Sequence, residues 1–212
     1  MKLQQMALFH DEHEIIEHLK TIGITQGFTI NHDGSVDVPQ TNVTYMSKPF
    51  DTIPIKYNRV LGFFVSSVPI TTLENCPEVV ERDFVVQTNA LLTTMKGGPS
   101  KVGGNYHISH TSLQTLEHAP LEVGGNFYIG YTNVKDFHNI HKTAFRNITL
   151  GGSLVLGPDV RNIVGLAAIP GITHIIIPLR HGKSASFNVS HNDVIQFQEQ
   201  LIDAGFSEKA KL

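Results

Sequence analysis

The chain has 212 residues and a formal net charge of −3, with 41% hydrophobic and 17% charged residues. This composition is typical of a folded chain, and it gives no electrostatic basis for binding nucleic acid. A single cysteine, Cys76, excludes an intrachain disulfide framework. The sequence shows no secretory signal and no apolar run long enough to cross a bilayer. It therefore predicts a protein that has no membrane contact and is located in a reducing cytoplasm.

An amphipathic helix and a hairpin are predicted near the N-terminus. Residues Asp11–Ile22 place apolar side chains on one helical face and acidic ones in the first turn, and Gly23 follows as a helix stop. Within Phe28–Val38, the pair Asp33-Gly34 separates two alternating runs, which is a strong hairpin signal. Residues 1–56 are therefore expected to cap one end of the fold.

Residues 57–178 carry an internal repeat, which is the clearest signal in the sequence. An aromatic residue recurs every 21 or 22 residues, at Phe63, Phe84, Tyr106 and Phe127. A β-branched residue follows each aromatic two positions later, at Val65, Val86, Ile108 and Ile129. Two further apolar positions recur in phase: Ile70, Leu92, Leu113 and Val134, and then Leu73, Met95, Leu116 and Phe137. This pattern predicts a repeat that stacks upon itself.

Each unit is expected to form a short strand, a turn and a proline-containing return. No single unit buries its apolar side alone, so the units should stack in register and pair their strands in parallel. The strand centres are expected at Phe64, Val85, His107 and Tyr128. The predicted fold class is thus an α/β repeat: a leucine-rich-repeat-like solenoid with a parallel β-sheet, an N-terminal helix and β-hairpin cap, and a C-terminal helix cap.

Paired glycines precede two of these strands, at Gly103-Gly104 and Gly124-Gly125. A phosphate-binding loop would have to open a helix, whereas a β pattern follows both pairs. We therefore interpret the pairs as tight corners of the chain, with positive φ where needed.

The period breaks after Phe137, in the stretch 138–150, which is either a decayed repeat or a functional insertion. Degenerate repeats follow, and the run Ile172–Pro178 predicts a final buried strand. Residues 179–190 are expected to be a polar loop. The four residues from Ser190 resemble a capping box that opens a last helix. Residues 179–212 would therefore form a loop and a helical cap, continuous with the solenoid in one domain.

The units PSKVGGNYHISHTSLQTLEHAP and PLEVGGNFYIGYTNV resemble the leucine-rich-type repeats of bacteriophage-encoded proteins, whose pattern includes Pro-x-x-Val-Gly-Gly-x-Phe. The chain is similar, more distantly, to short leucine-rich repeats of secreted bacterial effectors. The asparagine that ends the strand in the family pattern is kept approximately, as Asn89, Thr111 and Thr132. The resemblance implies a solenoid of mostly unknown function, with no catalytic motif, in the host cell cytoplasm.

Histidines and glycines give no catalytic or cofactor site. On a strand, the spacing of His107 and His110 puts the two rings on opposite faces, and His138 and His141 converge without an evident third metal ligand. Residues 180–184 mimic the end of a phosphate-binding motif whose first glycine position is occupied by Ile177. We therefore predict no catalytic residue, no metal and no cofactor.

The residues between the inward-facing positions should form an exposed ladder on the sheet. These residues are Phe64, Val85, His107 and Tyr128, continued by Val155. An apolar and aromatic ladder in place of polar side chains indicates a partner-binding surface. Alternatively, a loop, a terminal helix or a second subunit covers it.

Three functions remain open at this level. The first is a phage-encoded module that docks or inhibits a host or phage protein through its sheet face. The second is an enzyme or small-ligand-binding protein with its site in residues 138–150 or 179–190. The third is a structural or assembly component that associates with itself through the ladder.

Overall fold

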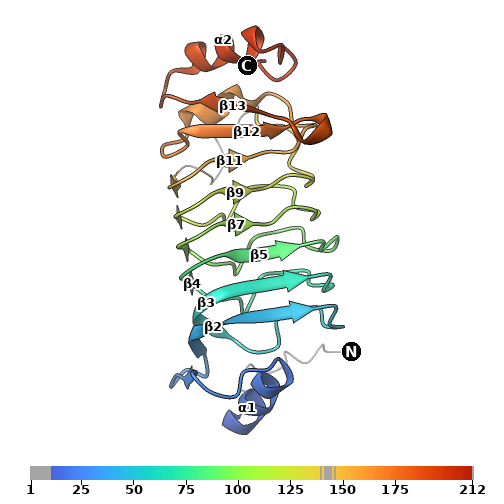
Figure 1. Cartoon of the computed structure of the whole chain (residues 1–212), viewed down its shortest axis with the longest axis vertical. Helices are drawn as coiled ribbons and strands as arrows, with labels where there is room; N and C mark the ends of the chain where they lie inside the picture. Colours follow the sequence, from blue (N-terminus) through green and yellow to red (C-terminus); the bar gives the residue numbers. More distant parts are fainter. Residues whose placement is uncertain (1–10, 139, 141–144, 146, 212) are drawn as a thin grey trace, which may run out of the picture.

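Short strands stacked along one long axis build the molecule, as Figure 1 shows. The computed structural model describes residues 11–138, 140, 145 and 147–211. Its parallel strands form a β-solenoid of about six turns. The front row of strands is β2 (Val36–Met46), β3 (Tyr57–Ser66), β5 (Phe84–Gln87), β7 (Tyr106–His107), β9 (Phe127–Tyr128), β11 (Leu154–Val155) and β12 (His174–Pro178).

The predicted strands and their phase are confirmed. The four strands that contain Phe64, Val85, His107 and Tyr128 pair in parallel and in chain order. The aromatic residues before them are fully buried and contact one another, with ring centroids 5.7 Å apart for Phe63 and Phe84, 4.9 Å for Phe84 and Tyr106, and 5.0 Å for Tyr106 and Phe127. All the apolar positions that recur in phase are buried as well.

A second row of strands was not predicted. It consists of β4 (Val79–Val80), β6 (Lys101–Val102), β8 (Glu122–Val123) and β10 (Thr149–Leu150), which also pair in parallel. The long strand β3 joins both rows, because it pairs with β4 through Arg59 and Val60 and with β5 from Phe63 onward. The expected proline-containing return is therefore partly a strand.

The paired glycines lie at the corner between the two rows, and they serve close approach rather than positive φ. Each φ of Gly103, Gly104, Gly124 and Gly125 is negative or extended. A Cβ on Gly124 would lie 2.1 Å from the carbonyl oxygen of Gly103, and one on Gly125 would lie 2.6 Å from Oδ1 of Asn105. Successive turns therefore stack backbone on backbone at this corner.

Five of the front strands, β2, β3, β5, β7 and β9, are followed by a residue in the left-handed backbone region. These residues are Ser47, Ser67, Thr88, His110 and Tyr131, with φ between 51° and 56°. In two of these turns the next residue turns its polar side chain inward: the amide of Asn89 donates to the carbonyl of Gln87, and the hydroxyl of Thr111 donates to that of Ile108. Asn and Thr are interchangeable here because either side chain reaches a carbonyl at the strand end.

The N-terminal helix and hairpin are present. Helix α1 (Glu12–Thr21) begins after Asp11, whose Oδ1 accepts a hydrogen bond from the N–H of Glu14, and Gly23 follows with a φ of 81°. Strand β1 (Thr29–Ile30) pairs antiparallel with the start of β2. The rest of β2 then pairs in parallel with β3, so the sheet begins within residues 1–56.

The C-terminal part contains a strand where a polar loop was expected. Strand β12 confirms the predicted final parallel strand, but β13 (Ser184–Asn188) follows it and pairs with it antiparallel. Two short 3-10 helices, η2 (Ile163–Ala168) and η3 (Arg180–Gly182), complete the region. The loop prediction was wrong because the alternating residues of β13 are mostly polar and exposed.

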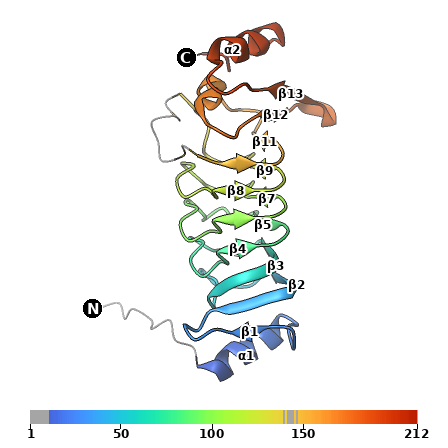
Figure 2. The same ribbon diagram turned by 90° about the vertical axis from the view of Figure 1, so that its left-hand side faces the viewer.

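Helix α2 (Val194–Asp203) ends the fold, and Gly205 follows it with a φ of 82°. Its N-cap is Asp193, whose Oδ1 accepts a hydrogen bond from the N–H of Gln196 at 3.0 Å, so the capping box that begins at Ser190 was wrong. The two views place α1 and α2 at opposite ends of the stack (Figures 1 and 2).

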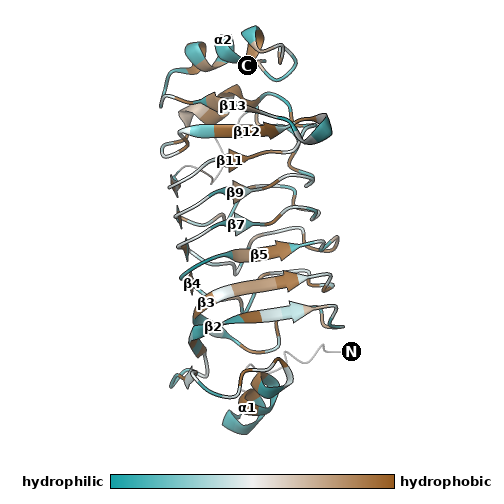
Figure 3. Cartoon of the chain, in the orientation of Figure 1, coloured by the Kyte–Doolittle hydropathy of each residue, from teal (hydrophilic) through white to brown (hydrophobic). Residues whose placement is uncertain are grey.

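The helices lie outside the regular turns. Between β3 and β9, all of whose residues the structure describes, the chain forms strands and turns without a helix. The fold is therefore a parallel β-solenoid, and the finer leucine-rich-repeat-like α/β assignment is not confirmed. Hydrophobic residues concentrate on the stacked strands, whereas both terminal helices alternate between hydrophilic and hydrophobic faces (Figure 3).

Candidate functional site

The predicted ladder exists as one column of residues in unbroken register. Phe64 pairs with Val85, Val85 with His107, His107 with Tyr128, and Tyr128 with Val155. The column also extends beyond the predicted residues, to Thr44 at one end and to Ile176 and Ser186 at the other. Sequence reasoning missed these members, although the alternation in Val43–Met46 and in Ile175–Pro178 would have included them.

The ladder residues are less exposed than predicted, and Val155 departs most from the prediction. The side chains of Phe64, Val85, His107 and Tyr128 are half-buried. Val155 keeps its place in the column but is only 9% exposed, so it offers little surface to a partner. Its short side chain lies in register between the longer Tyr128 and Ile176.

Two columns without Lys or Arg flank the ladder on the same face. Because side chains alternate along a strand, the residues two positions before and after each ladder residue share its face. One flank contains Asn42, Gly62, Asp83, Asn105, Asn126, Ser153 and His174, and the other contains Met46, Ser66, Gln87, Ser109, Gly130, Gly157 and Pro178. Together with the ladder, they carry no Lys or Arg and a single carboxylate.

That carboxylate begins a chain of hydrogen bonds along the first flank. Oδ1 of Asp83 accepts from the backbone N–H of Asn105 at 2.7 Å and from its side-chain amide at 3.1 Å. Oδ1 of Asn105 accepts from the N–H of Asn126, and Oδ1 of Asn126 accepts from that of Ser153. The Oδ1 atoms of Asp83, Asn105 and Asn126 therefore accept hydrogen bonds from the next turn of the protein itself.

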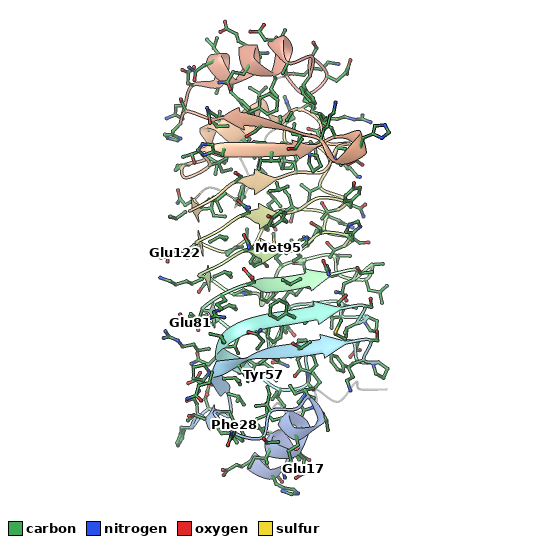
Figure 4. The ribbon with its side chains drawn as sticks, in the orientation of Figure 1. Glu17, Phe28, Tyr57, Glu81, Met95 and Glu122 are labelled. Atoms are coloured by element: carbon green, nitrogen blue, oxygen red, sulfur yellow. The ribbon has the colours of Figure 1, made fainter. Side chains whose placement is uncertain are left out.

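Two ion pairs lie along the other row of strands. Lys101 pairs with Glu122 at 2.6 Å, and Arg59 pairs with Glu81. Figure 4 shows Glu81 and Glu122 at the outer edge of the stack, away from the front strands. The front face is thus the apolar and neutral side of the molecule.

Two pairs of rings join neighbouring turns, one pair on the ladder and the other where the same front strands end. The rings of His107 and Tyr128 lie with centroids 4.9 Å apart, and those of His110 and Tyr131 stack at 4.5 Å and 10° from parallel. Burial lowers the pKa of His107, and charge repulsion from His110 lowers it further. His107 is therefore neutral over most of the physiological pH range.

A surface depression of about 330 Å³ lies at the other part of the ladder. Its lining comprises Asn42, Thr44, Met46, Phe64, Val65, Ser66, Val85 and Gln87. A Cβ on Gly62 would lie 3.0 Å from Cε2 of Phe64, so the ring lies over this glycine instead of standing away from the sheet. The depression therefore has an apolar floor and a rim of uncharged amides and hydroxyls.

The loops proposed as an alternative site do not assemble a polar centre in the described residues. His138 lines a separate depression of about 270 Å³ with Asp136 and Ile140, whereas His141 lies outside the described residues. His181 and Lys183 are exposed. Within the described part of the chain, no group of three His, Cys, Asp or Glu residues is arranged to hold a metal ion.

A polar depression of about 610 Å³ lies where the C-terminal residues meet the solenoid. Nζ of Lys209 donates to the carbonyls of Pro158 and Val160, and Lys135 pairs with Asp159. The contacts of Lys209 attach the C-terminal segment to the stack, so Lys209, Lys135 and Asp159 have structural partners.

Comparisons of the chain with protein-family models, with curated proteins and with solved structures find no match. None of the helices in the described part of the chain combines the length and apolar character that crossing a bilayer would require.

Proposed function

We propose that the chain is a protein-binding repeat module that docks or inhibits another protein through the ladder face and has no catalytic activity of its own. The observation that carries the proposal is the register of Phe64, Val85, His107 and Tyr128, which aligns apolar and aromatic side chains on a face without Lys or Arg. Partner-binding surfaces are typically enriched in aromatic residues and depleted of charge at their centre.

The resemblance to phage-encoded leucine-rich-type repeat proteins belongs to the same proposal. On this basis the partner is a host or phage protein in the cytoplasm of an infected cell, and helices α1 and α2 cap a leucine-rich-repeat-like solenoid. The Asn89, Thr111 and Thr132 positions support the resemblance, because all three are buried at the same corner of successive turns.

The test is the double variant His107→Glu with Tyr128→Glu. Both side chains are outside the buried core, so the fold should persist, while two carboxylates in a desolvated contact should abolish partner capture from infected cells. Lys101→Glu is the matched control, because it changes the net charge by the same amount on the other row of strands. It should retain capture.

Three outcomes would redirect the proposal. Full capture by the double variant would overturn docking on the ladder. Loss of partner capture only after changes at His138 or Lys183 would favour an enzyme or small-ligand-binding protein with its site in those loops. Loss of self-association in the double variant, with no other protein captured by the unaltered chain, would favour an assembly component.

A further inference from the structure

The two ends of the sheet differ in how their outermost strands are covered. At the C-terminal end, Phe187 of β13 contacts Phe197 of α2 and Phe206, with centroids 6.3 Å and 5.6 Å apart. At the N-terminal end, β1 pairs only with Val36 and Asp37 of β2. Among the described residues, no strand pairs with β2 beyond this point on the side away from β3.

The open part of β2 is regular. An irregular register between Val38 and Asn42, together with Pro39, interrupts the first half of the strand. From Asn42 to Met46, however, β2 pairs with β3 residue by residue. An irregular register and a proline both hinder pairing with an added strand. In β2 both are confined to the first half of the strand.

The backbone groups of three residues point to this open side. The N–H of Ser47 donates to the carbonyl of Ser66 in β3, at 3.1 Å. Because successive backbone groups of a strand point to opposite sides, those of Met46, Thr44 and Asn42 face away from β3. The side chains of the same three residues are exposed and line the depression at Phe64.

The chemistry of this edge fits a polypeptide strand. Alternating donors and acceptors along an open edge are complementary to an extended peptide backbone. No residue from Gln40 to Ser47 is charged, so the edge also lacks the lysines that commonly repel added strands. Helix α1 lies beyond β2 along the long axis, so this edge faces the N-terminal end of the stack (Figures 1 and 2).

We propose that the Asn42–Met46 edge of β2 binds an extended, uncharged segment of the protein partner by strand addition. One long apolar side chain of this segment then reaches over Thr44 to the Phe64 depression. Met46, which is 64% exposed and flexible, adapts to the added side chain. This inference rests on the proposed protein-binding function, because it requires the partner to be a polypeptide.

The experiment titrates the ¹⁵N-labelled chain with capped pentapeptides of sequence Ser-Val-X-Val-Ser, where X is Leu, Phe, Ser or Lys. The Leu and Phe peptides should move the amide protons of Asn42, Thr44 and Met46 downfield and slow their exchange with solvent. The Ser peptide should bind more weakly and the Lys peptide most weakly. A Leu peptide N-methylated at every residue should produce no such shifts, because it lacks the donors.

Two protein variants separate backbone pairing from side-chain contact. Thr44→Pro removes an edge N–H and should weaken binding of the Leu peptide at least tenfold, whereas Thr44→Val keeps the N–H and should bind within about twofold of the unaltered chain. Circular dichroism and the melting temperature establish that both variants fold. Should Thr44→Pro fail to fold, the N-methylated peptide still decides the question on the unaltered chain.

The absence of shifts at these three amides with all four peptides would overturn the inference, as would equal responses to the Leu peptide and its N-methylated form. The His107→Glu, Tyr128→Glu variant should bind the peptides normally, since its changes lie on other strands. Failure of edge binding is thereby distinguished from failure of docking on the ladder.

Discussion

The side-chain oxygen of Asn105 accepts a hydrogen bond from the backbone N–H of Asn126, one turn further along the stack, at 2.9 Å. This contact explains the recurrence of Gly-Gly-Asn before the front strands. The asparagine of one turn occupies the space above the second glycine of the next, where a Cβ would collide with it. The glycine of one turn and the Asn or Asp of the turn before it thus depend on each other, as neighbours in space rather than in sequence.

Gly125→Ala should destabilise the fold by about 1–3 kcal/mol, because the added Cβ meets Oδ1 of Asn105 at 2.6 Å and the backbone of Gly104 at 3.1 Å. Urea unfolding measures the change. Gly130→Ala is the matched control, since its nearest contact would be an ordinary 3.4 Å. Equal stability of the two variants would contradict the close approach at this corner.

Phe127→Ala should cost roughly 3–5 kcal/mol in the free energy of unfolding, which is the usual range for a buried aromatic residue. Phe127 is fully buried, pairs in register with Leu154 and contacts the ring of Tyr106. Tyr128→Ala, one residue away on the outer face, should cost much less. An unchanged melting temperature for Phe127→Ala would mean that the ring does not belong to the core.

His107 should titrate below the ordinary pKa of 6.5, because burial and the charge of His110 both disfavour its protonated form. The unfolded chain then binds the proton more readily than the folded chain. The contribution of His107 to stability is therefore complete above pH 6.5 and falls as the pH drops toward its folded pKa. Partner binding should weaken in the same window, because protonation places a charge in the contact.

NMR titration of the His107 ring measures this pKa directly, with His107→Gln as the control for stability. The control should lose less stability than the unaltered chain between about pH 7 and pH 5. A ring pKa at or above 6.5 would refute the assignment of a half-buried, neutral imidazole.

Binding of the protein partner should depend little on ionic strength. The ladder and its flanks carry no Lys or Arg, so few charge pairs form across the contact that salt would screen. Calorimetry in about 50 mM and about 500 mM salt should give dissociation constants within about threefold of each other. A tenfold weakening at high salt would place the contact on the charged row that contains Lys101 and Glu122.

Asp193→Ala should destabilise the chain by about 0.5–2 kcal/mol, because its carboxylate caps α2 through the N–H of Gln196. Ser190→Ala tests the capping box that the sequence suggested, and it should have a small effect. The reverse order of the two effects in thermal unfolding would restore Ser190 as the cap.

The parts of the fold that repeat were predictable from the sequence, and those that depend on contacts between turns were not. Phe63 and Phe127 share a phase that periodicity alone establishes. The two-residue strand Val79–Val80 is too short to show alternation, so its pairing with β6 is defined only by the stack. Strand β13 was missed because Ser184 and Ser186 suggested a loop.

The candidate site, like the fold, was predictable from the sequence only in part. Alternation predicted that Phe64, Val85, His107 and Tyr128 share one face. The low exposure of Val155 does not follow from alternation, and the residues that flank it in space, Tyr128 and Ile176, lie far from it along the chain. The depression at Phe64 depends on how the ring lies over Gly62, which no linear pattern records.

The register of the ladder has a consequence for how such a molecule changes in length. The chain uses more residues between Tyr128 and Val155 than between the earlier members of the column, yet both remain aligned. Each turn contacts only its neighbours, so gain or loss of one repeat would lengthen or shorten the binding face by a single strand spacing of about 4.8 Å without altering either end. Duplication of a 21- or 22-residue unit would thus fit the protein to a partner of different size in one genetic step.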